Sequence, residues 1–142
     1  MIKFCLLLCL VALSIQAEKM TVSVDFHSDI DGFRKRNPTH VALFIATWCP
    51  DCQNNAKTLQ SIFDKAVEKG FSTISGTVGS PQEFYSANNY LRSDSFYSVK
   101  NVPTVYIVKN GQIYKSIINK KIYDSKAVEE FLQFIDKGPQ GI

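Results

Sequence analysis

The stretch Thr47-Trp-Cys-Pro-Asp-Cys-Gln53 places two cysteines, Cys49 and Cys52, in a C-x-x-C arrangement behind a tryptophan. Such a pair can be a catalytic dithiol, half of a zinc site or a structural disulfide. A zinc site needs further ligands, and a disulfide-stapled fold needs further cysteines. The rest of the chain therefore decides among the three.

The first 17 residues have the pattern of a secretory signal peptide, because Lys3 precedes an unbroken apolar run from Phe4 to Leu13 and Ala17 ends a suitable cleavage site. A membrane-spanning helix would need about 17–25 apolar residues, and polar residues from Gln16 onward come too early. We expect cleavage after Ala17, no membrane anchor, and a single monomeric domain over residues 18–142. The expected location is outside the cell or in the secretory-pathway lumen.

The cysteine count separates the three possibilities. Two of the four cysteines lie within residues 1–17, so Cys49 and Cys52 alone remain in the mature chain. A structural zinc site uses four Cys or His ligands, and the two histidines, His27 and His40, do not have zinc-finger spacing. A disulfide across so short a loop would constrain the unfolded chain little. These residues favour a redox-active pair and predict neither a metal nor a cofactor.

Charge also limits the possible partners. The formal net charge of the whole chain is +3, and removal of Lys3 with the signal peptide leaves +2. This charge is too small to indicate a nucleic-acid partner. The adjacent pair Lys120 and Lys121 is expected to be ordinary solvated surface.

Apolar spacing predicts alternating strands and helices. Strands are expected over 21–26, 40–46, 71–78, 103–108 and 112–118, and helices over 29–36, from the cysteine pair to Gly70, in part of 82–98, and from Asp124 or Ser125 to Gly138. The continuous apolar run at 40–46 is typical of a strand buried on both faces, and Asn110-Gly111 is a strong hairpin signal. The pattern predicts an α/β fold in which helices flank a central mixed sheet.

Cys49 falls at the junction between a buried strand and a helix. Unpaired N–H groups and the helix dipole favour a thiolate there, so Cys49 is the candidate nucleophile, and Cys52 can resolve the mixed disulfide. Pro50 suits the first helical turn. Asp51 opposes thiolate formation by roughly 0.6 to 2.4 kcal/mol at about 7 Å, against at most ~2 kcal/mol from the helix end. The sequence leaves this balance open.

Two further positions are candidates for substrate contact. Trp48 is expected both to cover the start of the sheet and to form a flat wall beside the attacking sulfur. Pro103, which follows Val102, could be an ordinary proline at the start of an edge strand. With a C-x-x-C helix upstream, we favour a cis proline that faces the dithiol.

These motifs resemble the thioredoxin superfamily: Trp48-Cys-Pro-Asp-Cys52 at the strand-to-helix junction, and Val102-Pro-Thr104 before a hairpin. More narrowly, they are similar to the family of the thioredoxin-related protein of 14 kDa, which carries W-C-P-D-C. Val78-Gly79 and the stretch Asn88 to Arg92 also match, so the resemblance covers most of residues 40–118.

The resemblance implies a thioredoxin fold with Cys49 as the attacking and Cys52 as the resolving cysteine. It also implies that Pro103 is the cis proline and that the backbone of Val102 contacts the substrate. That family reduces disulfides, cystine included, with electrons from thioredoxin reductase. The expected partners are therefore disulfide-containing proteins or small disulfides, together with an external thiol or reductase as donor.

This sequence departs from the family in three places. Members of the family are cytosolic, whereas this chain begins with a signal-peptide pattern. Residues that they carry before the tryptophan are absent here, where Ile45 leads almost directly to Trp48. Leu43 stands where ordinary thioredoxins have a buried aspartate, so Cys52 has no evident proton acceptor.

Two alternative functions remain open at this point: a secretory-pathway disulfide oxidase or isomerase, and a redox-inert binding module with this fold. The C-terminus has no K-D-E-L-type retention signal, and Asp51 disfavours the reduced form of the pair. We therefore expect a disulfide reductase.

Overall fold

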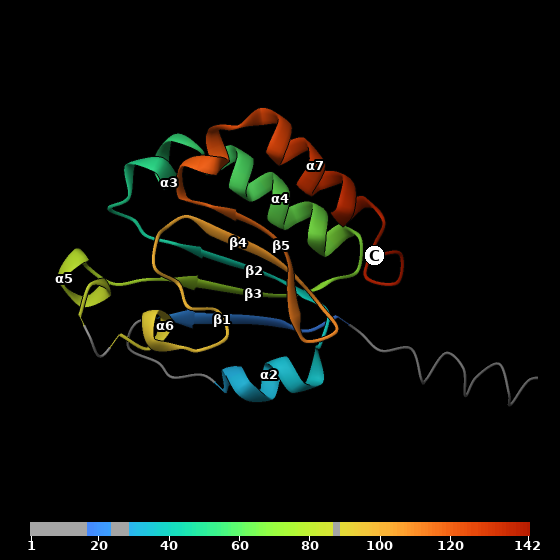
Figure 1. Ribbon diagram of the computed structural model, residues 1–142, viewed down its shortest axis with the longest axis horizontal. Coiled ribbons are helices and arrows are strands. Elements are labelled where there is room, and N and C mark those ends of the chain that lie inside the picture. Colours follow the sequence, from blue (N-terminus) through green and yellow to red (C-terminus); the bar gives the residue numbers. More distant parts are fainter. Residues whose placement is uncertain (1–16, 24–28, 87–88) are drawn as a thin grey trace, which may run out of the picture.

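A five-stranded mixed sheet forms the centre of the protein (Figure 1). The computed structural model describes residues 17–23, 29–86 and 89–142. The strands are β1 (Lys19–Ser23), β2 (His40–Ile45), β3 (Ser72–Thr77), β4 (Thr104–Lys109) and β5 (Gln112–Ile118), and they lie in the order β1-β3-β2-β4-β5. The first three strands are parallel, whereas β4 runs antiparallel to β2 and β5 antiparallel to β4. The expected mixed sheet is confirmed.

Helices cover both faces of this sheet. The helices are α2 (Ile30–Arg36), α3 (Pro50–Asn54), α4 (Ala56–Glu68), α5 (Pro81–Phe84), α6 (Tyr90–Ser93), the 3₁₀ helix η1 (Asn119–Tyr123) and α7 (Ser125–Asp136). Helices α4 and α7 lie together on one side of the sheet, and α2 lies on the other (Figure 1). The apolar positions Leu59, Ile62 and Ala66 of α4 are buried, as their helical spacing indicates.

The central strand β2 carries the chain into the candidate site. Val41, Ala42 and Phe44 are completely buried, because the parallel neighbour β3 and the antiparallel neighbour β4 flank this strand and helices cover both faces. The continuous apolar run was therefore interpreted correctly. Since β2 ends at Ile45, Cys49 follows after a short connection at the end of a rigid, buried strand.

Two expectations about element boundaries need correction. The single helix expected from the cysteines to Gly70 is divided into α3 and α4 at Asn55, whose backbone (φ −118°, ψ 21°) leaves helical geometry. The Asn55 side chain donates a hydrogen bond to the Asp51 carbonyl at 2.8 Å, a local alternative to helical pairing. The first strand begins at Lys19, two residues earlier than expected, while residues 24–26 and His27 lie outside the described residues.

The hairpin and the final helix agree with the sequence signals. Asn110 and Gly111 both have positive φ (51° and 77°), the conformation that an Asn-Gly turn between antiparallel strands requires. Asp124 caps α7, because its side chain accepts hydrogen bonds from the N–H groups of Lys126 and Ala127.

A buried histidine pairs with a buried tyrosine on the α2 side of the sheet. His40 is completely buried; its Nδ1 lies 2.8 Å from the Asn37 carbonyl oxygen and its Nε2 lies 2.7 Å from the Tyr97 hydroxyl. A carbonyl can only accept, so Nδ1 donates to it and Nε2 accepts from Tyr97. Burial lowers the pKa of His40 to about 4.

We expect this histidine to make the fold sensitive to mild acid. The unfolded chain protonates His40 near pH 6.5 and the folded chain only near 4, so stability falls as the pH falls through this window. Between pH 7 and pH 5 the loss should be about 2 kcal/mol, measured as the free energy of unfolding in urea. The His40→Gln variant is less stable at pH 7 but should lose most of this pH dependence. Equal pH dependence in both proteins would contradict the assignment.

Candidate dithiol active site

Cys49 occupies the N-cap position of α3, where its sulfur takes the place of the usual capping oxygen. Its backbone is extended, and its Sγ accepts a hydrogen bond from the Cys52 N–H at 3.1 Å. Pro50 fills the first position of the helix, where a missing N–H costs nothing, and its side chain is exposed. Both thiols are free in this structure, with 3% and 5% of Cys49 and Cys52 exposed.

The environment of the two sulfurs distinguishes their roles. Burial raises the pKa of the Cys52 thiol to about 12, and the neighbouring Cys49 sulfur adds to the shift. Cys52 is therefore protonated at neutral pH and is a poor first nucleophile. Cys49 is the N-cap residue of α3, the position expected for the attacking cysteine.

The loop before β4 faces the dithiol. The Val102–Pro103 peptide bond is cis, as expected. The Cys49 Sγ lies 3.5 Å from the Val102 carbonyl oxygen, with the thiol as donor. The backbone beside Pro103 is therefore adjacent to the sulfur that would react, although the two segments are 53 residues apart in the sequence.

Trp48 belongs to an aromatic wall beside the dithiol, which we define as Trp48, Phe84 and Tyr85. The indole N–H donates to the Gly79 carbonyl, and the Trp48 ring centroid lies 6.1 Å from that of Phe84 and 6.3 Å from that of Tyr85. The Arg92 guanidinium lies over the Tyr85 ring at 5.2 Å. Tyr85 is 58% exposed and thus available to a partner. Of these three aromatic residues, the sequence predicted only Trp48 as part of the site. Phe84 and Tyr85 were missed because no spacing rule relates Trp48 to residues at the distant short helix α5.

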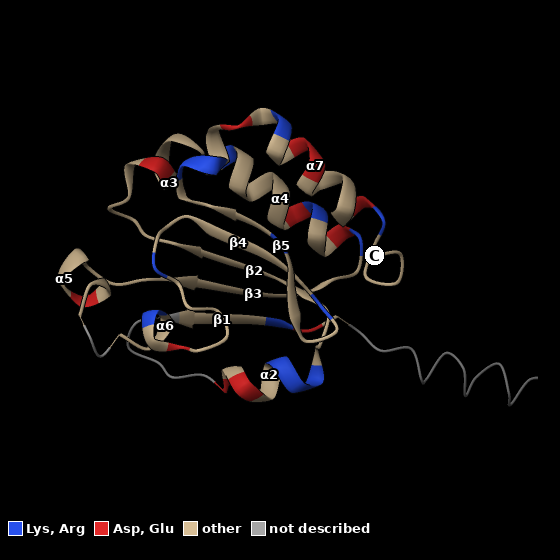
Figure 2. Ribbon diagram, viewed as in Figure 1, with Lys and Arg blue, Asp and Glu red and all other residues tan. Residues whose placement is uncertain are grey.

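The Asp51 carboxylate is held by two side chains of η1. It accepts a hydrogen bond from the Tyr123 hydroxyl at 2.8 Å. It also accepts a hydrogen bond from the Lys120 ammonium at 3.1 Å, so the two side chains form a salt bridge. The Tyr123 hydrogen bond first, and the Lys120 contact second, hold the pKa of this carboxyl below its usual range. Basic residues of η1 thus lie beside the acidic residue of α3 (Figure 2). Lys120 and Lys121 are exposed, as expected, but the sequence did not indicate that Lys120 pairs with Asp51.

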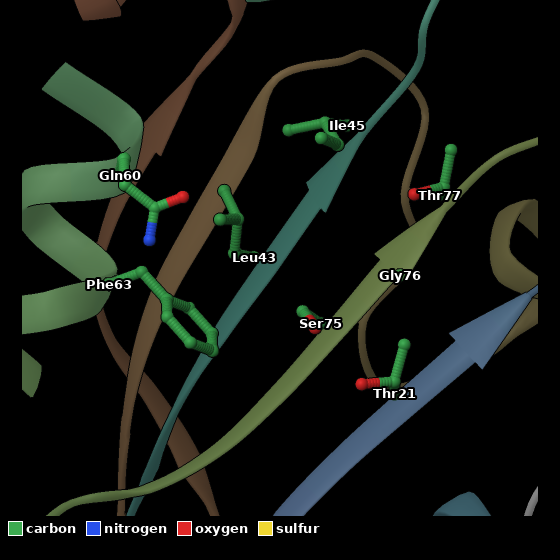
Figure 3. A pocket seen from close by; sticks show the side chains of 8 residues that line it. All are labelled: Thr21, Leu43, Ile45, Gln60, Phe63, Ser75, Gly76 and Thr77. Carbon is green, nitrogen blue, oxygen red and sulfur yellow. The ribbon is translucent and has the colours of Figure 1, made fainter. Parts of the chain in front are cut away.

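Leu43 lines a groove beside α4 rather than a proton-transfer site. The groove has a volume of about 210 Å³ and is lined by Thr21, Leu43, Ile45, Gln60, Phe63, Ser75, Gly76 and Thr77 (Figure 3). None of these eight side chains is a carboxylate, histidine or cysteine. Leu43 thus borders a groove that has none of these acid–base groups in its lining.

The described residues contain neither a candidate metal centre nor a candidate membrane-spanning helix. No three Cys, His, Asp or Glu side chains are grouped there as metal ligands would be, and His40 is committed to the core through Asn37 and Tyr97. Over the same residues, no helix has the length and apolar character that a membrane crossing requires.

A solved thioredoxin structure shows the same fold. The reduced thioredoxin pre-protein of Schistosoma mansoni is 19% identical, with a TM-score of 0.50 over 84% of this chain and 99% of that one. Mitochondrial thioredoxin 3 of Saccharomyces cerevisiae is 18% identical, with a TM-score of 0.49 over 80% and 94%. At such identities the likeness shows the fold alone. No protein with a curated description matches the sequence.

A family model gives the more specific assignment. The model described as thioredoxin domain-containing protein 17-like, thioredoxin domain, matches residues 22–134, most of the chain. The match includes Cys49, Cys52 and Pro103, and it covers strands β2 to β5 completely. Thiol-disulfide oxidoreductase chemistry is the general activity that this family and fold support. The chain belongs to the thioredoxin domain-containing protein 17-like family and has the thioredoxin fold.

Proposed function

We propose that the protein uses Cys49 and Cys52 to reduce disulfides of proteins or small molecules, cystine included, with electrons from an external thiol or reductase. The observation that carries this proposal is the position of the Cys49 sulfur. It caps α3 through the Cys52 N–H and lies beside the Val102 carbonyl at the cis proline. One reactive sulfur is thus next to a backbone edge that an extended substrate can approach.

In the first step, the Cys49 thiolate attacks one sulfur of the substrate disulfide. A Cys49–substrate disulfide forms, the substrate S–S bond breaks, and the released thiolate takes a proton from water. The N–H groups at the start of α3 stabilise negative charge on Cys49 before the attack. The Val102 backbone lies beside the sulfur, and it would orient the substrate together with Trp48 and the exposed Tyr85.

In the second step, Cys52 gives its proton to solvent water and attacks the Cys49 sulfur, so that a Cys49–Cys52 bond forms and the Cys49–substrate bond breaks. The second substrate thiolate leaves, so the substrate gains two electrons and the protein retains a Cys49–Cys52 disulfide. The Cys49 sulfur is one cause of the raised Cys52 pKa, and its negative charge disappears in the mixed disulfide. This change favours deprotonation of Cys52 at the moment when it must act. An external thiol then restores the dithiol and completes the cycle.

The direction of the reaction is part of the proposal. The secretory lumen has a glutathione poise of roughly −180 to −210 mV, where a thioredoxin-like dithiol near −270 mV rests as a disulfide. The signal-peptide pattern therefore makes the reductase dependent on a donor outside the protein. The second candidate function is that of a disulfide oxidase or isomerase. It is favoured only if the reduction potential of the Cys49/Cys52 pair is clearly higher than that of thioredoxin.

Loss of Cys49 should abolish reduction. Purified protein with dithiothreitol should accelerate the reduction of insulin or cystine, and the Cys49→Ser variant should be at background, because no other thiol can attack first. Lys121→Gln is a matched control, since Lys121 contacts Asp124 at 3.8 Å and no residue of the dithiol. Equal rates for the wild type and Cys49→Ser would refute the proposed activity.

Loss of Cys52 should stop the reaction halfway. The Cys52→Ser variant should accumulate a mixed disulfide through Cys49, because attack proceeds but resolution does not. Non-reducing electrophoresis and peptide mass spectrometry after incubation with a disulfide substrate detect the adduct. An adduct through Cys52 in the Cys49→Ser variant, at a comparable yield, would reverse the two roles.

A further inference from the structure

The side chains of Lys120 and Tyr123 form a clamp on Asp51, the acidic residue between the two cysteines. The Lys120 Nζ lies 3.1 Å and the Tyr123 hydroxyl 2.8 Å from the same carboxylate oxygen, Oδ1. The Asn54 side chain donates to the Tyr123 hydroxyl at 3.2 Å, and the Lys120 ammonium lies 5.7 Å from the centre of the Tyr123 ring. Every member of the clamp therefore contacts at least one other.

The clamp joins two segments far apart in the sequence. Asp51 lies in the first turn of α3, and η1 follows the edge strand β5, 69 residues later. The side chain of Asp51 is only 16% exposed, whereas that of Lys120 is 76% exposed. The Asp51 side chain is thus partly covered, and its counter-charge comes from the exposed Lys120.

An unpaired carboxylate at this position would oppose the chemistry of the dithiol. A negative charge near a thiol disfavours the thiolate, and Asp51 is one of the lesser causes that raise the pKa of Cys52, after burial and the Cys49 sulfur. A cation and a hydroxyl donor on the same oxygen reduce the field that the carboxylate exerts on the sulfurs. The sequence alone shows Asp51 as unfavourable for the thiolate; the structure adds a cation and a hydroxyl donor at the same carboxylate.

We infer that Lys120 and Tyr123 are positioning residues that act through Asp51 to keep Cys49 reactive as a thiolate. The inference rests on the proposed role of Cys49 as the attacking thiol, but its test does not require turnover. It also explains how a W-C-P-D-C motif can carry an acidic residue between its cysteines without losing a nucleophile. The titratable groups of the described residues in contact around the pair are Cys52, Asp51, Lys120 and Tyr123.

The test is the pH profile of Cys49 alkylation by iodoacetamide in the reduced, full protein at low ionic strength. Lys120→Gln should move the midpoint of this profile to higher pH. At a given pH, the ratio of thiolate to thiol at Cys49 should be about three- to tenfold lower than in the wild type. Tyr123→Phe keeps the ring and removes one hydrogen bond, so we expect a smaller shift, about twofold. Since Lys120 is exposed, its effect should shrink in about 0.5 M salt.

Two controls separate a tuning role from a structural one. Lys121→Gln removes the same charge from the neighbouring position without touching Asp51 and should leave the midpoint unchanged. In an Asp51→Asn background, Lys120→Gln should lose at least half of its effect. Thermal unfolding of each variant reports stability separately.

The possible outcomes are distinct. A Lys120→Gln shift no larger than that of Lys121→Gln, or one undiminished in the Asp51→Asn background, would overturn the inference. Lowered melting temperatures with unchanged midpoints would also overturn it, because the clamp would then only join α3 to η1. Shifted midpoints in a protein that reduces no disulfide would support the clamp and reject the proposed reductase function.

Discussion

The hydrogen bond from the Cys52 N–H to the Cys49 sulfur is the contact on which the site depends. It exists because β2, buried at the centre of the sheet, ends just before a proline-initiated helix, so that Cys49 becomes the cap of that helix. Cys52 follows in the first turn of α3, where burial raises its pKa to about 12. In the proposed reaction, Cys49 attacks first and Cys52 stays protonated until Cys49 has reacted.

Segments that are distant in the sequence supply the other groups around this contact. The loop at the cis Pro103 brings a backbone carbonyl to the Cys49 sulfur. Tyr85, which follows α5 as its C-cap, adds an exposed ring beside Trp48. Helix η1 supplies the groups that pair with Asp51. The sheet holds these loops at one end, so the chemistry depends on strand order as much as on the C-x-x-C motif.

Local signals in the sequence predicted much of this arrangement. The apolar run of β2 and the Asn110-Gly111 turn follow from residue types and short-range spacing. The cis Pro103 was expected from the C-x-x-C helix far upstream and from the family resemblance. The structure confirms all three. The break at Asn55 was missed because apolar spacing continues through it. Lys120 and Tyr85 were missed for a different reason: their roles depend on tertiary contacts 69 and 37 residues distant. The signal-peptide expectation falls on residues that the structure does not describe.

The most direct test of the account is the equilibrium reduction potential of the Cys49/Cys52 pair, measured in glutathione buffers with the fraction of free thiol read by mass spectrometry. A disulfide reductase of this family should have a potential close to that of thioredoxin, about −270 mV. Such a value, with reversible exchange between dithiol and disulfide, is the predicted result. A potential at or above about −180 mV would contradict the account and make the protein an oxidase or isomerase.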